Sequence, residues 1–199
     1  MKDPIVLGIS GASGAVYARR LLEVLLETDE IVHLVVSPAA ALVFKQEIDV
    51  DLDVDNFQLE KLLPGVKPKP GHLHYHRLSD YMTPIASGSF RTKAMIVCPC
   101  SGGTLSAIVT GASRNLIHRA ADVHLKERRP LILVPRETPL STIQLENMHK
   151  ASMAGATVLP ASPGWYHGVE SLSDLIDFIV ARILDHLEID HSLMRRWGE

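Results

Sequence analysis

The stretch from residue 5 to residue 14, IVLGISGASG, decides the fold. It starts with a five-residue apolar run, Ile5 to Ile9, which is typical of a buried strand, and a turn of small residues, Ser10 to Gly14, follows directly. From Ala15 to Leu26 the apolar residues recur at helical spacing. A buried strand, a glycine-rich turn and a helix in this order predict the first unit of a parallel α/β sheet.

The same alternation continues along the chain. Further strands are expected at 31–36, 94–98, 131–134 and 157–159, and helices at 39–46, 104–109, 115–128 and 172–187. Another helix is expected to begin at Pro139, with Thr138 as its N-cap. Strands that alternate with helices predict a parallel sheet with right-handed crossovers. We expect one domain over residues 1–199, with an irregular insertion of unassigned structure around 48–92 and a C-terminal tail at 189–199.

Composition excludes several classes of protein. The 199 residues are 46% hydrophobic and 22% charged, which is near the globular average and rules out disorder. The net charge of −3 provides no basic excess to hold nucleic acid. The two cysteines rule out a disulfide framework and favour a reducing compartment. With no signal peptide and no apolar stretch near the ~20 residues of a membrane span, a cytoplasmic α/β domain is expected.

Unusual residues gather where the predicted strands end. In open parallel sheets, ligands bind beyond the carboxyl ends of the strands. Small, hydroxylated, charged and aromatic residues follow these ends at Ser10–Gly14, Ser37–Pro38, Cys98–Thr104, Pro135–Thr138 and Pro160–His167. A purely structural sheet needs only turns there, so the pattern predicts a ligand site at this edge.

The first turn favours a phosphorylated ligand. Gly8, Gly11 and Gly14 have GxxGxxG spacing, which lets the backbone approach an anion at a helix N-terminus. A dinucleotide site would need an acidic residue at the end of the second strand, where this chain has Ser37. A mononucleotide or another phosphorylated ligand is therefore favoured, and a turn required only for strand–helix packing stays open as the alternative. The run 101–104, Ser-Gly-Gly-Thr, is a second loop of this kind.

Charged residues and thiols lie at the same strand ends. Arg136 and Glu137 follow the strand at 131–134, and beside two anion-binding loops we favour a role in the site over a solvated ion pair. Cys98 and Cys100 lack the two-residue spacer of the redox motif, so Cys98 is expected in the strand core.

Metal-binding patterns are present but incomplete. Alternate histidines would share one face of a strand and suit zinc, at positions His72, His74 and His76. No carboxylate or cysteine lies close to them in sequence, so a solvated histidine strip is favoured. An acidic run matches the ligand positions of a calcium loop, but Val54 stands where that loop needs glycine. No metal site is predicted.

Several stretches together resemble the flavin prenyltransferase family of the UbiX type. They are Gly8–Gly14 (GISGASG), Ala86–Ser89 (ASGS), Cys98–Leu105 (CPCSGGTL), Asn115–Arg129, Val134–Pro139 (VPRETP), Leu145–Met148 (LENM) and Pro163–His167 (PGWYH). The resemblance runs nearly end to end and is weakest from 50 to 75.

This resemblance implies the fold and the reaction. The fold would be three-layer and flavodoxin-like or Rossmann-like, a parallel sheet with helices on both faces. Family members join a dimethylallyl group from dimethylallyl phosphate to reduced FMN, at N5 and C6. The product, prenylated FMN, serves UbiD-type decarboxylases. No metal is required, and members assemble as a homo-oligomer, a dodecamer, with sites between subunits.

The resemblance also implies roles for single residues. FMN would be held by Gly11, Ala12, Ser13, Ser37, Ser101, Gly102, Gly103, Thr104 and Arg136. The prenyl phosphate would meet Arg119, Lys126, Glu137, Tyr166, Arg182 and Trp197. The catalytic residues would include Ser13 and Glu47, which act near flavin N5. From the chemistry of the leaving phosphate, we add the hypothesis that Glu137 is catalytic and shares the proton with this group. Tyr81 stands where some relatives carry Trp.

Two other functions stay open. A flavin-dependent cysteine decarboxylase has a similar glycine loop, but it typically carries an early catalytic histidine and a Pro-Ala-Met-Asn motif. This chain has no histidine just after Gly14 and has Pro135–Pro139 (PRETP) in place of that motif. A non-catalytic FMN carrier would not need arginines and lysines beyond those for the FMN phosphate. The sequence does not decide between a mono- and a diphosphate donor.

Overall fold

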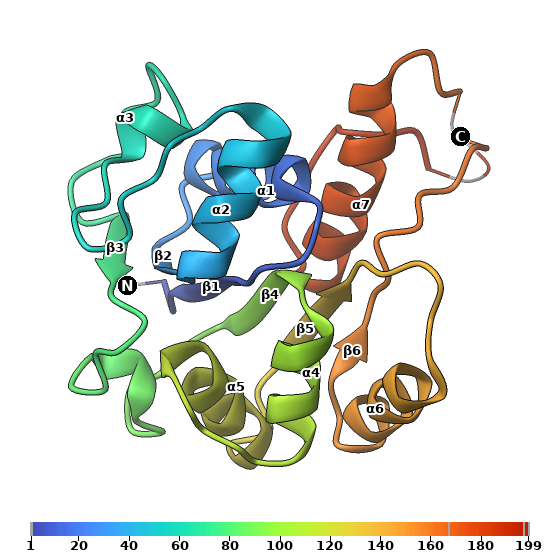
Figure 1. The fold of residues 1–199 in the computed structure, drawn as a ribbon. Helices are drawn as coiled ribbons and strands as arrows, with labels where there is room; N and C mark the ends of the chain where they lie inside the picture. The colour runs from blue at the N-terminus through green and yellow to red at the C-terminus, as the bar shows by residue number, and fades with distance from the viewer. Residues whose placement is uncertain (1, 167, 197, 199) are drawn as a thin grey trace.

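The computed structural model describes residues 2–166, 168–196 and 198, and over these it contains one parallel six-stranded sheet (Figure 1). Its order is β3-β2-β1-β4-β5-β6, and each neighbouring pair is parallel. The strands are β1 (Ile5–Ile9), β2 (Val32–Val36), β3 (Leu73–His76), β4 (Ala94–Cys100), β5 (Leu131–Pro135) and β6 (Thr157–Val158).

Helices cover both faces of the sheet, which confirms the expected three-layer α/β fold. The helical segments are α1 (Ala15–Glu27), α2 (Pro38–Ile48), α3 (Leu59–Leu62), the 3-10 turn η1 (Pro84–Ala86), α4 (Gly102–Val109), α5 (Leu116–Lys126), α6 (Thr142–Met153) and α7 (Leu172–His186). One core lies between the sheet and α1, α2 and α7. The other lies between the sheet and α4, α5 and α6.

Strand β1 is the centre of both cores. Leu7 packs into the core with α1 and α7, and Val6 packs into the core with α4 and α5, because successive strand side chains point to opposite faces. Each such side chain stabilises the fold by about 1.5–3 kcal/mol when fully buried. Gly8 has a packing role here, since a Cβ at this position would lie 3.1 Å from Cγ2 of Ile117 on α5.

The helix expected to begin at Pro139 begins three residues later, so that prediction is wrong. Its N-cap is Ser141, whose hydroxyl accepts a hydrogen bond from the Gln144 amide at 3.2 Å. The Gln144 side chain in turn accepts one from the Ser141 amide at 2.9 Å. This capping box satisfies two backbone amides, whereas a Thr138 cap would satisfy one.

The insertion supplies the edge strand β3, which the sequence left unassigned. In β3, His74 lies opposite His33 of β2, and the His33 ring stacks against those of His74 and His76. His33 Nδ1 lies 2.8 Å from His76 Nε2. The strip was expected to be solvated, but only His74 is exposed while His72 and His76 are half-buried, because pairing with β2 covers one side.

Over the described part of the chain there is neither a metal-binding cluster nor a membrane-spanning helix. No group of three or more His, Cys, Asp or Glu residues within it is arranged to hold a metal ion. None of its helices has the length and apolar character needed to cross a membrane.

The buried histidine of β2 predicts a pH-dependent stability. Burial, and then the neighbouring His76 and His74, lower the pKa of His33 to about 4. The fold thus favours the neutral His33 ring. The contribution of this preference to the free energy of unfolding is complete above the ordinary pKa near 6.5 and is lost as the pH falls toward 4. We expect His33→Gln, which cannot titrate, to be less stable than wild type at pH 7, with a gap that narrows between pH 6.5 and 4. Urea unfolding across this range measures it, and a gap independent of pH would contradict the assignment.

Candidate active site

The strand order places a crevice at the carboxyl ends of β1 and β4. Chain connections leave these two neighbouring strands toward opposite sides of the sheet, which is where open α/β sheets bind ligands. Buried Ser10 bridges the two strand ends: its hydroxyl donates to the Pro99 carbonyl at 2.9 Å and accepts from the Ser101 amide at 2.8 Å. The first glycine loop and the Ser101 loop are therefore fixed next to each other.

A carboxylate of the chain itself occupies the N-terminus of α1. One oxygen of Glu47, near the end of α2, accepts hydrogen bonds from the Gly14 amide at 2.9 Å and the Ala15 amide at 2.8 Å. Gly14 adopts a positive φ of 121°, which glycine tolerates. The sequence predicted a ligand phosphate at this helix start, but the structure places the Glu47 carboxylate on these amides instead.

Ser13, Glu47 and Arg136 meet at this point. Arg136, just after β5, donates from Nε to the Ser13 carbonyl at 3.2 Å. Partial burial raises the pKa of the Glu47 carboxyl, but hydrogen bonds from the Ser13 hydroxyl and from the Gly14 and Ala15 amides, with the charge of Arg136, lower it below its usual value overall. Glu47 is therefore a stable carboxylate beside a hydroxyl and a guanidinium.

Two more helices begin at the same edge with serine caps. Ser37 accepts from the Ala40 amide at 3.1 Å at the start of α2. Ser101 accepts from the Thr104 amide at 3.3 Å at the start of α4, and its hydroxyl donates to that of Thr104 at 3.0 Å. Helix geometry provides no carbonyl partner for the first amides of α4, at Gly102 and Gly103, so they suit an anion.

The glycines of the two loops have different roles. A Cβ on Gly11 would lie 2.5 Å from the Cβ of Ala39, so close packing of the loop on α2 already requires glycine there. This supports a packing role for Gly11. Gly103 borders open space, with no atom within 4 Å of a Cβ built on it. A small residue at Gly103 is thus not required by packing and leaves room for a bound molecule.

Glu137 turns away from Arg136 toward α6. One oxygen of Glu137 accepts from the Thr138 amide at 3.1 Å, and the other accepts from the Gln144 side chain at 3.3 Å. This exposed carboxylate therefore lies at the carboxyl edge, near the start of α6, and Arg136 contacts the first glycine loop instead.

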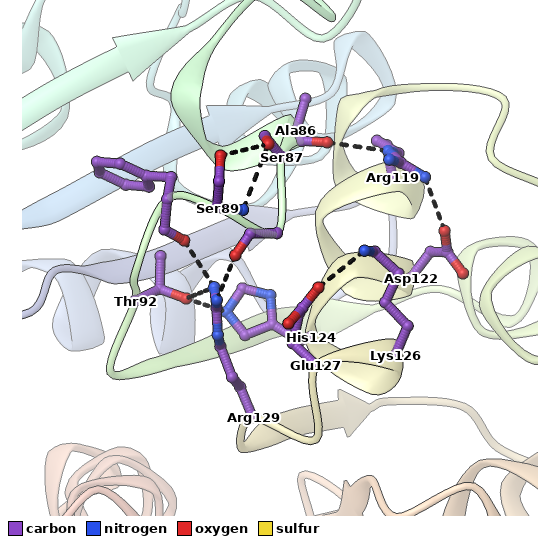
Figure 2. Close-up of polar contacts among 12 residues, drawn as sticks. Ala86, Ser87, Ser89, Thr92, Arg119, Asp122, His124, Lys126, Glu127 and Arg129 are labelled. Carbon is purple, nitrogen blue, oxygen red and sulfur yellow. Dashed lines mark hydrogen bonds and ion pairs between the residues drawn. The ribbon is translucent and has the colours of Figure 1, made fainter.

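A second polar cluster lies along α5 (Figure 2). Arg119 donates from Nε to the Ala86 carbonyl at 3.0 Å and pairs with Asp122 at 3.0 Å. At the end of the helix, Lys126 pairs with Glu127 at 2.8 Å. The helix therefore carries two cations toward the segment 86–92, which leads into β4.

Ser87 and Ser89 are site residues to which the sequence assigned no role. Their hydroxyls lie 2.9 Å apart on the loop that faces α5 (Figure 2). Between them, Gly88 approaches α5 so closely that a Cβ there would lie 3.0 Å from Nζ of Lys126 and would contact Glu127. The Ser-Gly-Ser pattern was the available signal, but only the fold shows that it faces Lys126.

Two further predicted substrate residues, Arg182 and Tyr166, lie with α7 on the other face of the sheet. Arg182 of α7 donates to Asp185 at 2.6 Å. Tyr166 is exposed and packs edge-on against Phe178 of α7, with ring centroids 5.8 Å apart. Trp197 lies outside the described residues.

Within one chain these groups do not meet. Ser13, Glu47 and Arg136 lie at the carboxyl edge, whereas Lys126 ends its helix five residues before β5 begins, which places it at the amino edge. Helices α5 and α7, which carry Arg119 and Arg182, cover opposite faces. Within one chain, the carboxyl edge therefore brings together the residues expected to hold FMN and also Glu137, but not Lys126 and Arg182.

Both cysteines are buried free thiols. Burial raises the pKa of Cys98 far above its usual value and that of Cys100 to about 12. Neither thiol ionises near neutral pH, so neither is a ready nucleophile.

Comparison with known proteins shows the class of protein and then its family. Residues 1–184 match the family model Flavoprotein, so the chain is a flavoprotein. It is 51% identical over 198 residues to the flavin prenyltransferase UbiX of Pseudomonas aeruginosa, covering 99% of this chain and 95% of the relative. The chain therefore belongs to the flavin prenyltransferase UbiX family, as its motifs predicted, and is an enzyme of the transferase class.

Solved structures agree with this assignment. A UbiX protein in complex with FMN and dimethylallyl pyrophosphate is 40% identical, with a TM-score of 0.87 over 100% of this chain and 99% of that one. A dodecameric FMN-dependent UbiX-like decarboxylase from Escherichia coli O157:H7 is 38% identical, with a TM-score of 0.85 over the whole of both chains.

The Glu47 cap predicts a measurable loss of stability. We expect Glu47→Gln to lower the free energy of unfolding by about 0.5–1 kcal/mol at pH 7, because a neutral amide interacts less with the helix dipole. Since the pKa of Glu47 is lowered in the fold, its contribution is present above the usual carboxyl pKa and is lost as the pH falls below it. The gap to wild type should therefore close in acid. Urea unfolding at pH 7 and pH 4 measures it, with the exposed Glu146→Gln as control; equal losses from both variants would contradict the cap.

Proposed function

We propose that this enzyme transfers the dimethylallyl group of dimethylallyl phosphate to reduced FMN, forming bonds at flavin N5 and C6 and releasing phosphate. The observation that carries the proposal is that the chain holds two separate sets of anion-binding groups. One lies at the carboxyl edge around Arg136, and the other lies along α5 around Arg119 and Lys126. A relative with the same fold binds both FMN and dimethylallyl pyrophosphate.

The carboxyl edge suits FMN. Ser37, Ser101 and Thr104 offer hydroxyls, Gly102 and Gly103 offer helix-start amides beside open space, and Arg136 offers a guanidinium. Gly11, Ala12 and Ser13 complete this proposed FMN site on the first loop. Bound there, the flavin would supply the atoms that accept the prenyl group.

The cluster on α5 suits the phosphate of the prenyl donor. Arg119 and Lys126 carry two cations on α5, and the loop that faces them carries the hydroxyls of Ser87 and Ser89. Arginine can bind phosphate through two parallel hydrogen bonds, and lysine adds a point charge.

The complete site requires more than one chain. The proposed substrate residues Arg119 and Lys126 lie on α5, away from Glu137 at the carboxyl edge. They are also separated from Arg182 on α7 and from Tyr166 in the segment before α7, because α5 and α7 cover opposite faces of the sheet. We therefore propose that neighbouring subunits bring these groups together with Trp197, in a dodecamer like that of the Escherichia coli relative.

Each residue has a proposed part in the reaction. Breaking the allylic C–O bond leaves a phosphate anion, whose charge Arg119, Lys126 and Arg182 offset without a metal. Glu137 would hold or deliver a proton at the leaving phosphate, whose second pKa lies near 6. The Ser13 hydroxyl helps to lower the pKa of the Glu47 carboxyl, and the two residues would handle the proton at flavin N5. Water must be excluded, because it would capture the allylic cation.

A decarboxylase is the second candidate, since the Escherichia coli relative carries that description. The site offers no acidic thiol for such chemistry, because both cysteines are buried with raised pKa values. A prenyltransferase needs the basic cluster on α5 to bind the phosphate of its donor. A decarboxylase or a carrier that binds only FMN would have no second anion for this cluster. We further propose that the product serves UbiD-type decarboxylases and that the protein is cytoplasmic, in keeping with its free thiols.

The deciding experiment is the mass of the flavin after anaerobic incubation of the protein with reduced FMN and dimethylallyl phosphate. We expect FMN that has gained one C5H8 unit, with one phosphate released per flavin. The same incubation with dimethylallyl diphosphate identifies the donor. Flavin of unchanged mass with both donors would overturn the proposal.

The two anion sites predict separable losses of affinity. We expect Lys126→Ala to weaken binding of dimethylallyl phosphate by at least tenfold and to leave FMN affinity within twofold of wild type, because Lys126 belongs to the proposed donor-phosphate cluster on α5 and not to the proposed FMN site. Calorimetric titration with each ligand measures both values, and Arg128→Ala, at an exposed neighbouring position, is the control. Equal losses for the two ligands would reject separate sites.

A further inference from the structure

Arg129 makes an extended set of contacts that the reaction outlined above does not use. It follows α5 and reaches across to the segment 86–92 (Figure 2). One terminal nitrogen, Nη1, donates to the Phe90 carbonyl at 2.6 Å and to the Thr92 hydroxyl at 3.3 Å. The other, Nη2, donates to the Gly88 carbonyl at 2.5 Å. A single guanidinium thus binds two backbone carbonyls and one side chain of the same loop.

A buried histidine sets the orientation of the Thr92 hydroxyl. His124 Nδ1 lies 2.7 Å from the Ala120 carbonyl, which can only accept, so the proton is on Nδ1. His124 Nε2 is then an acceptor, and the Thr92 hydroxyl donates a hydrogen bond to it at 2.9 Å. The oxygen of this hydroxyl therefore accepts the hydrogen bond from Arg129. Burial lowers the pKa of His124, in keeping with a neutral ring.

The segment held by Arg129 is the one that carries the proposed phosphate hydroxyls. Ser87 and Ser89 flank Gly88, whose carbonyl Arg129 binds. Arg119 binds the Ala86 carbonyl on the other side of this loop. Arg119 would also have to bind phosphate, whereas Arg129 can hold the loop both before and after phosphate binds.

We propose that Arg129, oriented through Thr92 and His124, is a positioning residue that fixes the segment 86–92 against α5, so that Ser87, Ser89 and Lys126 face one phosphate. This inference rests on the proposed function. Arg129 acts through the loop and not on the substrate, because its terminal nitrogens donate to Gly88, Phe90 and Thr92. Lysine could not replace it, since an ammonium lacks the planar fork that spans two carbonyls.

The test compares Arg129→Lys with Arg128→Lys at the exposed neighbouring position. For Arg129→Lys we expect a rise of at least tenfold in KM for dimethylallyl phosphate, FMN affinity within twofold of wild type, and faster hydrogen exchange at the amides of residues 87–92. Arg128→Lys should change none of these. An Arg129→Lys enzyme with wild-type KM and wild-type exchange would overturn the proposal.

A second pair of variants tests the proposal in case Arg129→Lys does not fold. Thr92→Val is nearly isosteric and removes the hydroxyl, whereas Thr92→Ser keeps it. We expect Thr92→Val to show the same defects in weaker form and Thr92→Ser to restore wild-type values, because the relay through His124 needs only the hydroxyl. Equal behaviour of the two variants would contradict the relay.

The outcome also separates this inference from the proposed function. Dimethylallyl phosphate affinity and hydrogen exchange are measured without turnover. A wild-type enzyme that binds the donor but makes no prenylated flavin would reject the proposed function, and the positioning role would still be decided by the affinity of Arg129→Lys. Wild-type protein that does not bind dimethylallyl phosphate at all would overturn both.

Discussion

The carboxylate of Glu47 at the N-terminus of α1 is the contact on which the arrangement of the site depends. It joins the end of α2 to the start of α1, and Arg136 beyond β5 binds the same loop through the Ser13 carbonyl. Three elements that are distant in sequence are thereby fixed at the switch point of the sheet. Because the interaction is between an anion and helix-start amides, it stabilises the helix and holds a charged group beside the crevice.

This contact also limits where a ligand phosphate can bind. The amides of Gly14 and Ala15, which a dinucleotide fold would aim at a pyrophosphate, already serve Glu47. A phosphate at this edge must therefore rely on other donors, and the start of α4 and the guanidinium of Arg136 lie nearby on the same edge. The sequence led to the same preference for a mononucleotide, because position 37 holds a serine where a dinucleotide site needs an acidic residue.

The sequence predicted the fold well where periodicity was strong and poorly where other forces decide. The strands β1, β2 and β5 were found because both of their faces are buried and apolar residues dominate them, with His33 of β2 as an exception. Strand β3 was missed because an edge strand of four residues with two histidines has no such run; its pairing with β2 and the stacking on His33 hold it in place. Pro139 was misleading as a helix start, since the capping box at Ser141 competes with it successfully.

The site was predictable as a set of residues but not as an arrangement. Local spacing suggested the glycine loops, and the family motifs named Arg119, Lys126 and Arg182, yet nothing in the sequence shows that these cations lie on opposite faces of the sheet. That separation has a physical consequence. Several cations packed around an empty pocket within one chain would repel one another, whereas the proposed assembly would distribute them over surfaces that meet only between subunits and would spread this cost. Each cation meanwhile pairs with a nearby carboxylate: Asp122 with Arg119, Glu127 with Lys126, and Asp185 with Arg182 and also with Arg196. In the separate chain these carboxylates offset the charge of the proposed phosphate-binding groups, and the proposed assembly followed by phosphate binding would exchange these local partners for a shared anion.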